Sequence, residues 1–412
     1  MTKYNHTPEL LLPAGNMEKL NAALRFGADA VYLAGRRFGM RAGADNFDLP
    51  EIAEATALAH AMGKKVYATV NTMPRTHEYE ALEAYIKSLA PLGLDALIVA
   101  DPGVFALCRT CAPETPLHIS TQAGVVSAAD CLFWASQGAK RVVLARELSL
   151  QDIKQIRSLV PDSLELEAFI HGSMCVSYSG RCLLSENILG RDANRGLCAQ
   201  PCRWNFNQYE IEEEKRPGMR FPVEQGPEGT FILSSKDLCM IEHIPALMQS
   251  GLDSFKIEGR MKSACYAAVC ANTYRMAIDT YGASPETYRY NPAWWAELES
   301  VTHREYATGF FFDHPLQNAQ LCTQPGYQKE KAFLAAVTGK QGERAVLCQR
   351  NKLSEGDPAV LLTPGSCGIP FTIRDLRNER GEKIDSAPHP YMTCTIEPPI
   401  EMSVGDLIRA GA

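Results

Sequence analysis

Four cysteines are concentrated in one stretch of the sequence, HGSMCVSYSGRCLLSENILGRDANRGLCAQPCRW, which begins at residue 171. They are Cys175, Cys182, Cys198 and Cys202, with the spacing C-x6-C-x15-C-x3-C. Thiolates bind zinc ions and iron–sulfur clusters. Structural zinc sites favour cysteines two residues apart, and neither pair here has that spacing. The loose spacing favours an iron–sulfur cluster, with a zinc site and a site without metal as the alternatives.

The chain has 14 cysteines in all, and no run is long and apolar enough for a signal peptide or a transmembrane helix. We therefore expect a cytoplasmic protein with no membrane association, whose thiols stay reduced. Most other cysteines lie on apolar or amphipathic segments and should pack as small hydrophobic side chains. Cys239 is the competitor, because it lies in the same insertion as the cluster and could replace Cys202 as a ligand.

Positive charge accompanies these thiols. Arg181, Arg195 and Arg203 lie between or beside the cysteines, and Arg260 follows in the segment KIEGRMK. A guanidinium group matches carboxylate and phosphate geometry through paired hydrogen bonds. Such arginines could offset the charge of a thiolate cluster, bind an anionic substrate, or do both. The plainer alternative is a solvated charged surface.

Eight short apolar runs precede and follow this stretch and must position it. They begin at Leu10, Ala30, Val66, Ala96, Leu117, Arg141, Leu166 and Ser254, and helical patterns separate most of them. Short, continuously apolar runs are typical of parallel strands buried on both faces. Eight such units predict a TIM-type (β/α)8 barrel of the α/β class. An open doubly wound sheet is the alternative, which the absence of a G-x-G-x-x-G turn disfavours.

Polar residues end several of these runs, and the active site of such a barrel lies at the C-terminal ends of its strands. The residues are Asn71, Asp101, Gln122, Arg146, Glu147, His171, Lys256 and Glu258. Any one of them could simply be a solvent-exposed residue at a strand end. Together they predict a ligand-binding mouth.

The seventh and eighth runs are separated by an insertion at about residues 171–253, which holds the four cysteines and should lie over this mouth. From about residue 327 the sequence pattern changes to short apolar runs separated by Gly, Pro and Asn, which is typical of an all-β domain. We therefore predict a catalytic barrel domain over residues 1–326 and a small C-terminal β-barrel domain over residues 327–412.

Five segments, ELLLPAGN, GADAVYLAG, SYSGRCLLS, NRGLCAQPCRW and KIEGRMKS, together resemble the collagenase-like family 32 of unclassified peptidases. The resemblance is strongest to its tRNA-hydroxylating group and covers nearly the whole chain. It implies a [4Fe–4S] cluster on Cys175, Cys182, Cys198 and Cys202. It also implies conversion of the tRNA wobble uridine to 5-hydroxyuridine, with the dicarboxylate prephenate as oxygen source. Some relatives draw their last ligand from farther along the chain, which keeps Cys239 in question.

The site residues suit this activity better than proteolysis. His171 and Cys175 could form a nucleophile–base pair, but that would leave three cysteines unexplained, and the H-E-x-x-H motif of zinc proteases is absent. Instead we expect His171, Glu147 or Glu258 to act as general acid–base groups. Asn71, Gln122, Arg146, Arg181, Arg195, Arg203, Lys256 and Arg260 should bind substrate.

The net charge of −7 predicts that tRNA meets a local basic patch, not a basic surface. A homo-oligomer, or a hetero-oligomer with a paralogue, is compatible with the sequence. The alternatives are a hydroxylase of rRNA or of a quinone precursor, and a peptidase.

Overall fold

The computed structural model describes residues 7–41, 44–175, 177–178, 182–203, 210–212, 220–222, 224–226, 229–231, 235–312 and 331–411. Arg181 and the predicted domain boundary at residue 326 lie outside these residues. Of Arg203, only the backbone is described.

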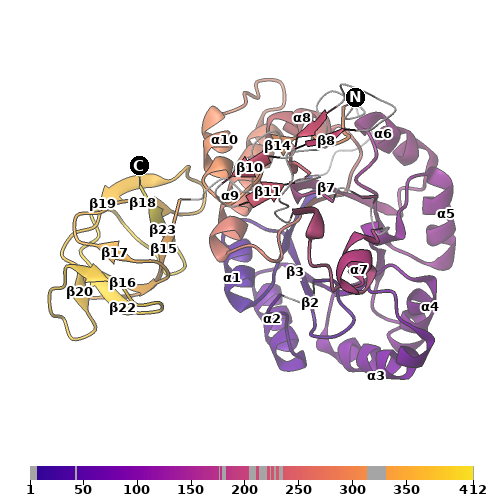
Figure 1. The fold of residues 1–412 in the computed structure, drawn as a ribbon, viewed down its shortest axis with the longest axis horizontal. Coiled ribbons are helices and arrows are strands. Elements are labelled where there is room, and N and C mark those ends of the chain that lie inside the picture. Colours follow the sequence, from indigo (N-terminus) through magenta and orange to yellow (C-terminus); the bar gives the residue numbers. More distant parts are fainter. Residues whose placement is uncertain are drawn as a thin grey trace.

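Eight parallel strands form a closed barrel, as the sequence predicts (Figure 1). They are β1 (Glu9–Pro13), β2 (Ala30–Ala34), β3 (Lys65–Val70), β4 (Ala96–Val99), β5 (Leu117–Ile119), β6 (Arg141–Val143), β7 (Glu165–Ser173) and β13 (Ser254–Ile257). The last strand, β13, closes the barrel because it pairs with both β7 and β1. All the strands are largely buried, which explains their nearly continuous apolar sequence.

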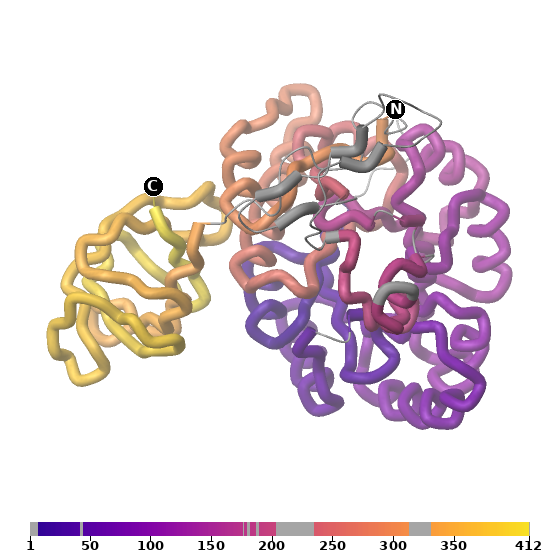
Figure 2. The backbone as a smooth tube through the Cα atoms, in the orientation of Figure 1, coloured from indigo at the N-terminus to yellow at the C-terminus, as the bar shows by residue number. Residues whose placement is uncertain are grey.

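Helices surround the barrel (Figures 1 and 2). They are α1 (Met17–Arg25), α2 (Leu49–Ala61), α3 (Tyr79–Leu89), α4 (Pro102–Cys111), α5 (Ala128–Gln137), α6 (Leu150–Leu159), α8 (Ile244–Met248), α9 (Ala264–Ala283) and α10 (Pro292–Glu299). Polar side chains cap many of their N-termini. Asp101 does so for α4, accepting a hydrogen bond from the Val104 amide. This strand-end carboxylate therefore starts a helix and does not enter the mouth.

The insertion leaves β7 and returns along it. It contains α7 (Leu184–Leu189), the short hairpin strands β8 (Glu210–Glu212), β9 (Arg220–Pro222), β10 (Glu224–Gly226) and β11 (Gly229–Phe231), and then β12 (Asp237–Cys239). Strand β12 runs antiparallel to the end of β7 and places Cys239 opposite His171. Strand β14 (Tyr306–Ala307) adds to β12 in parallel.

A chain of buried charges fills the barrel interior below the mouth. Arg141 Nη1 lies 2.6 Å from Glu9 Oε1 and 2.9 Å from Glu167 Oε2, and Lys256 Nζ lies 2.7 Å from Glu167 Oε1. Glu167 is wholly buried, so each of its oxygens needs such a cation. The ammonium group of Lys256 is thereby fixed at the floor of the mouth.

The C-terminal domain is all-β and surrounds its own apolar core. Its main sheet joins β15 (Phe333–Gln341), β16 (Arg344–Gln349), β18 (Pro358–Leu362), β19 (Ile369–Thr372), β20 (Arg377–Asn378), β22 (Thr393–Ile396) and β23 (Leu407–Ala410), and β17 (Leu353–Ser354) pairs with β21 (Ser386–Ala387). Strand β23 pairs with β15 and β18 near the middle of the sheet.

Ion pairs join this domain to the barrel domain. Arg409 lies 2.6 Å from Glu297 of α10, and both side chains are buried. Arg25 of α1 lies 2.5 Å from Asp406. Breaking the buried Arg409–Glu297 pair would leave a buried charge without a partner, so this pair holds the domain against α10. No helix in the described part of the chain is both long and apolar enough to cross a membrane.

Candidate active site at the barrel mouth

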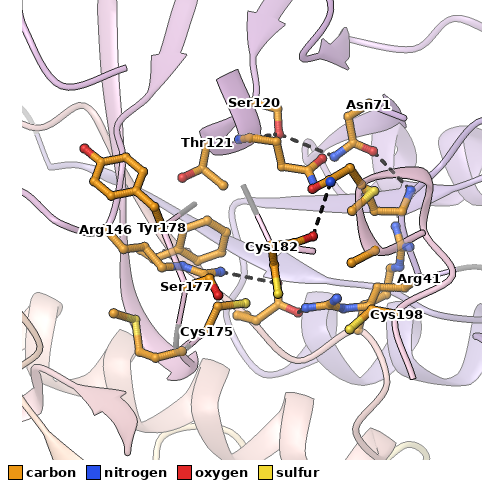
Figure 3. Close-up of a pocket in the computed structure, with 18 of the residues that line it drawn as sticks. Arg41, Asn71, Ser120, Thr121, Arg146, Cys175, Ser177, Tyr178, Cys182 and Cys198 are labelled. Carbon is orange, nitrogen blue, oxygen red and sulfur yellow. Dashed lines mark hydrogen bonds and ion pairs between the residues drawn. The ribbon is translucent and has the colours of Figure 1, made fainter. Parts of the chain in front are cut away.

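A cavity opens at the C-terminal ends of the barrel strands, where the sequence predicts the mouth (Figure 3). Residues from the barrel and from the insertion line it together. Of the predicted site residues, it brings together Asn71, Gln122, Arg146, Glu147, Cys175, Cys182, Cys198, Cys202, Lys256, Glu258 and Arg260. This gathering of polar groups on a concave surface makes the mouth the candidate active site.

All four cysteines of the insertion line this cavity, and none of them forms a disulfide. Figure 3 shows Cys175, Cys182 and Cys198 in one part of it. Local hydrogen bonds shape their loops: Asn194 Nδ2 donates to the Cys182 carbonyl over 3.3 Å, and the Gln200 amide donates to Cys198 Sγ over 3.3 Å. Within the described residues, no three His, Cys, Asp or Glu side chains form a group that could hold a single metal ion.

Cys239 occupies a different environment from these four. It is buried in the core of the barrel domain, with Sγ 3.9 Å from the hydroxyl of Tyr274, and it does not line the cavity. Burial raises the pKa of its thiol to about 12. The arrangement around the cavity therefore favours Cys202 over Cys239 as the fourth candidate ligand.

Glu258 is the central charge of the cavity wall. Its carboxylate lies 3.7 Å from Arg41, 3.9 Å from Arg146 and 3.1 Å from the hydroxyl of Tyr32. Burial by itself would raise the pKa of Glu258, but Arg41, Arg146 and Arg260 more than offset it and hold the pKa below its usual value. Glu258 is therefore ionised at neutral pH and suited to holding cations, not to donating a proton.

Sequence analysis missed Arg41. It lies in the loop after β2, with φ of 65°, a left-handed conformation that non-glycine residues rarely adopt. Burial by itself would lower the pKa of Arg41, but the nearby carboxylate of Glu258 and the thiols of Cys175 and Cys198 raise it. The available signal was the run of arginines in GRRFGMRAG directly after an apolar strand.

Arg260 presents an unsatisfied edge inside the cavity wall. It is only 3% exposed, and Nη1 makes one long hydrogen bond of 3.4 Å to Thr69 Oγ1. Nε and Nη2, which form the two-pronged edge of a guanidinium, have no partner. Burial lowers its pKa to about 10, so it remains charged at neutral pH. Unpaired buried donors are costly, and a carboxylate or phosphate would satisfy both at once.

Neutral hydrogen-bonding groups form another side of the cavity. Asn71 Oδ1 accepts from the Met40 amide over 3.2 Å, and its Nδ2 lies 3.4 Å from Ser120 Oγ. Gln122 Oε1 is buried without a partner. Figure 3 shows Asn71 and Ser120 across the cavity from the cysteines. This side can therefore accept a hydrogen bond from a hydroxyl or amide of a ligand.

Two further predicted binding residues are held by aromatic rings. The guanidinium of Arg146 lies 4.0 Å from the ring centre of Phe169, and Lys256 Nζ lies 4.5 Å from that of Tyr32. Together with the ion pairs to Glu258 and Glu167, these cation–π contacts position both charges at the cavity. Glu147 also lines the cavity and remains a candidate for proton transfer.

Two predicted residues do not reach the cavity. His171 is 1% exposed and packs among the rings of Tyr266, Tyr274 and Tyr306. Its Nε2 has no partner, and burial lowers its pKa to about 3. This placement corrects the prediction that His171 acts as a general acid–base group in the mouth. Arg195 pairs with Glu78 over 2.7 Å and faces a neighbouring groove.

Because His171 lies outside the mouth, it does not form the nucleophile–base pair of a cysteine protease with Cys175. Cys175 lines the cavity, whereas the two ring nitrogens of His171 face Tyr274 or find no partner. A thiol needs an adjacent base to become a protease nucleophile. The described residues thus do not place this histidine to activate Cys175.

Fold and site define an α/β-barrel protein whose mouth carries four thiols beside three arginines, Arg41, Arg146 and Arg260. A model described as Peptidase family U32 matches residues 15–321, and one described as Peptidase family U32 C-terminal domain matches residues 329–409. The chain belongs to peptidase family U32.

Relatives extend this family match. The chain is 37% identical over 406 residues to tRNA hydroxylation protein P1 of Bacillus subtilis, covering 98% of this chain and 95% of that protein. It is 36% identical to tRNA hydroxylation protein P of Escherichia coli K12, covering 98% and 96%. It is 37% identical to the 23S rRNA 5-hydroxycytidine C2501 synthase of the same organism, covering 68% and 40%.

The burial of His171 predicts a specific pH dependence of stability. Its folded pKa lies below its unfolded value, so the unfolded chain binds an extra proton as pH falls below about 6.5 and stability drops. His171→Gln should flatten this dependence by about 1.4 kcal/mol per pH unit between about pH 6 and pH 4. Urea unfolding across that range measures it. The same change at exposed His389 is the control. Equal slopes for both variants would contradict the buried neutral histidine.

Proposed function

We propose that this chain is an RNA-modifying hydroxylase that converts the wobble uridine of tRNA to 5-hydroxyuridine. The observation that carries the proposal is the cavity at the barrel mouth, where four thiols lie beside Arg41, Arg146 and Arg260. Two relatives that span nearly the whole chain are named tRNA hydroxylation proteins. A cytoplasmic location follows from a tRNA substrate.

The donor set suits a [4Fe–4S] cluster on Cys175, Cys182, Cys198 and Cys202. All four cysteines line the same cavity on loops of the insertion, and Arg41 lines it with them. A cubane binds each thiolate at a separate iron, so its ligands stand farther apart than those of a single zinc ion. When bound, the cluster would supply a redox-active or Lewis-acidic centre at the mouth.

Prephenate, a dicarboxylate, is the proposed source of the hydroxyl oxygen. Arg260 has the open Nε and Nη2 edge that a carboxylate fits, and Lys256 lies at the cavity floor. Gln122 Oε1 is an unpaired acceptor for a hydroxyl of such a ligand. Arg146 adds a further positive charge to the same cavity.

In this arrangement Glu147 is the residue that we assign to proton transfer. Glu258 is held ionised by its arginines, and His171 lies outside the cavity. Glu147 lines the cavity from the loop after β6, where a bound ring could contact it. A general acid–base group must first of all lie within reach of the reacting atoms. Glu258 then acts as a positioning residue.

Hydroxylation of rRNA is the second candidate, because one relative is named an rRNA hydroxycytidine synthase. This chain spans only 40% of that protein, whereas it spans 95% of a tRNA hydroxylation protein. The fuller match favours tRNA. A quinone precursor as substrate and assembly with a paralogue remain expectations from the sequence. Peptidase activity is disfavoured by the placement of His171.

The function is tested in tRNA from a strain that lacks this chain. Mass spectrometry of digested tRNA should show 5-hydroxyuridine derivatives lost on deletion and restored by the wild-type chain. Cys175→Ala should fail to restore them, because it removes a proposed cluster ligand. Unchanged wobble uridines in the deletion strain, with no paralogue present, would overturn the proposal, as would a change confined to rRNA.

The cluster is tested by anaerobic purification. Cys202→Ala should lose iron and the broad visible absorption of an iron–sulfur cluster, whereas Cys239→Ala should keep both, because its thiol lies in the core. Iron is measured chemically and the cluster by absorption and electron paramagnetic resonance. Stoichiometric zinc without iron in the wild type would refute the cluster, and iron loss in Cys239→Ala alone would reverse the ligand assignment.

The role of Arg260 is tested by two substitutions. Arg260→Gln and Arg260→Lys should each raise KM for prephenate about 10- to 100-fold, because neither offers the charged two-pronged edge. KM for tRNA should change little. Unfolding temperature and cluster absorption exclude simple misfolding. A prephenate KM that lysine fully restores would show that Arg260 supplies charge alone.

A further inference from the structure

A second hollow lies beside the cysteine-lined cavity, and we call it the arginine groove. Residues 36–39, residues 72–74, His77, Glu78 and Arg195 line most of it. It holds three arginines against one carboxylate, that of Glu78, although the whole chain has a net charge of −7. Positive charge is therefore concentrated locally, as a polyanion would require.

The groove and the cavity share one wall. Neighbouring residues of three segments face the two sides: 38–39 and 40–41, Thr72 and Asn71, Arg195 and Asn194. Backbone contacts join these segments, since the Thr72 amide donates to the Phe38 carbonyl over 3.3 Å and the Met73 amide donates to the Asn194 carbonyl over 3.4 Å. A chain lying in the groove is thus separated from the cavity by this one wall.

The loop after β2 places arginines on both sides of this wall. Phe38 and Arg41 both have left-handed φ angles, of 57° and 65°. Such conformations are strained for residues other than glycine and persist only where the surroundings enforce them. Their effect here is that Arg41 lines the cavity, while Arg36 and Arg37 line the groove.

These two outward arginines are available to a ligand. The Arg36 side chain is 62% exposed, and its Nη2 lies 3.5 Å from Asp48 and 3.7 Å from Glu51, two exposed pairings that solvent screens. Arg37 is exposed, lies 5.1 Å from the ring centre of Phe38, and forms no ion pair with any described residue. Arg195, in contrast, is engaged with Glu78.

We propose that the arginine groove binds the phosphate backbone of the RNA strand next to the nucleotide that enters the cavity. The inference rests on the proposed RNA substrate. Phosphates spaced along a strand match exposed guanidinium groups along a groove, and the shared wall places the groove beside the cavity. An acidic protein segment would also suit the charge, but nothing in a protein ligand would require the adjoining cavity.

The test is the charge-reversal pair Arg36→Glu and Arg37→Glu in one variant. Fluorescence anisotropy measures tRNA affinity between low and moderate KCl concentrations. We expect affinity to fall about tenfold or more, and the slope of log K against log salt to shrink by about 1.4, for two lost contacts to a single strand. Turnover at saturating tRNA should be largely kept, because neither residue lines the cavity.

The matched control is Arg109→Glu with Lys154→Glu, which makes the same change in net charge on exposed positions of the outer helices α4 and α6. It should alter affinity and slope little. If the reversal variant misfolds by circular dichroism, Arg36→Gln with Arg37→Gln replaces it. Affinity and slope equal to the control would overturn the proposal. Normal tRNA binding by a wild type that hydroxylates no RNA would instead refute the proposed function.

Discussion

The arrangement of the cavity depends on the carboxylate of Glu258, whose side chain is 13% exposed. Arg41 and Arg146 lie within 4 Å of it, and Arg260 also lowers its pKa. Three guanidinium groups could not share so small a space without an ionised partner, because each would repel the others at low dielectric. Three cations around one carboxylate still leave a surplus of positive charge. Thiolates and an anionic substrate are the groups that this surplus would accommodate.

Barrel closure brings these charges to one place. Strand β13 lies between β7 and β1, and its alternation directs Phe255 and Ile257 into the apolar core, while Lys256 lines the cavity. Glu258 and Arg260 continue this pattern beyond the strand end. Below them, Glu167 binds Lys256 and Arg141, so the floor of the mouth is fixed by ion pairs inside the barrel.

The barrel was predictable because strands buried on both faces leave continuous apolar runs, and all eight runs coincide with strands. The position of the four cysteines at the mouth was predictable because they are concentrated in one insertion that follows a barrel strand. Arg41 was not, because its place depends on a left-handed loop conformation that sequence patterns do not specify. His171 was misplaced because a strand-end histidine can face the mouth or the neighbouring core, and only the aromatic packing of Tyr274 and Tyr306 decides.

A net negative protein can still bind a polyanion if its positive charge is local. Here the cavity wall directs Arg41 inward and Arg36 and Arg37 outward, from the same loop. Elsewhere, most arginines named above are paired with carboxylates, as Arg141 and Arg409 are, and contribute little outward field. RNA would therefore be repelled over much of the surface and attracted beside the mouth. Electrostatics of this kind would direct association to the side of the mouth, because a strand gains most where exposed guanidinium groups meet its phosphates.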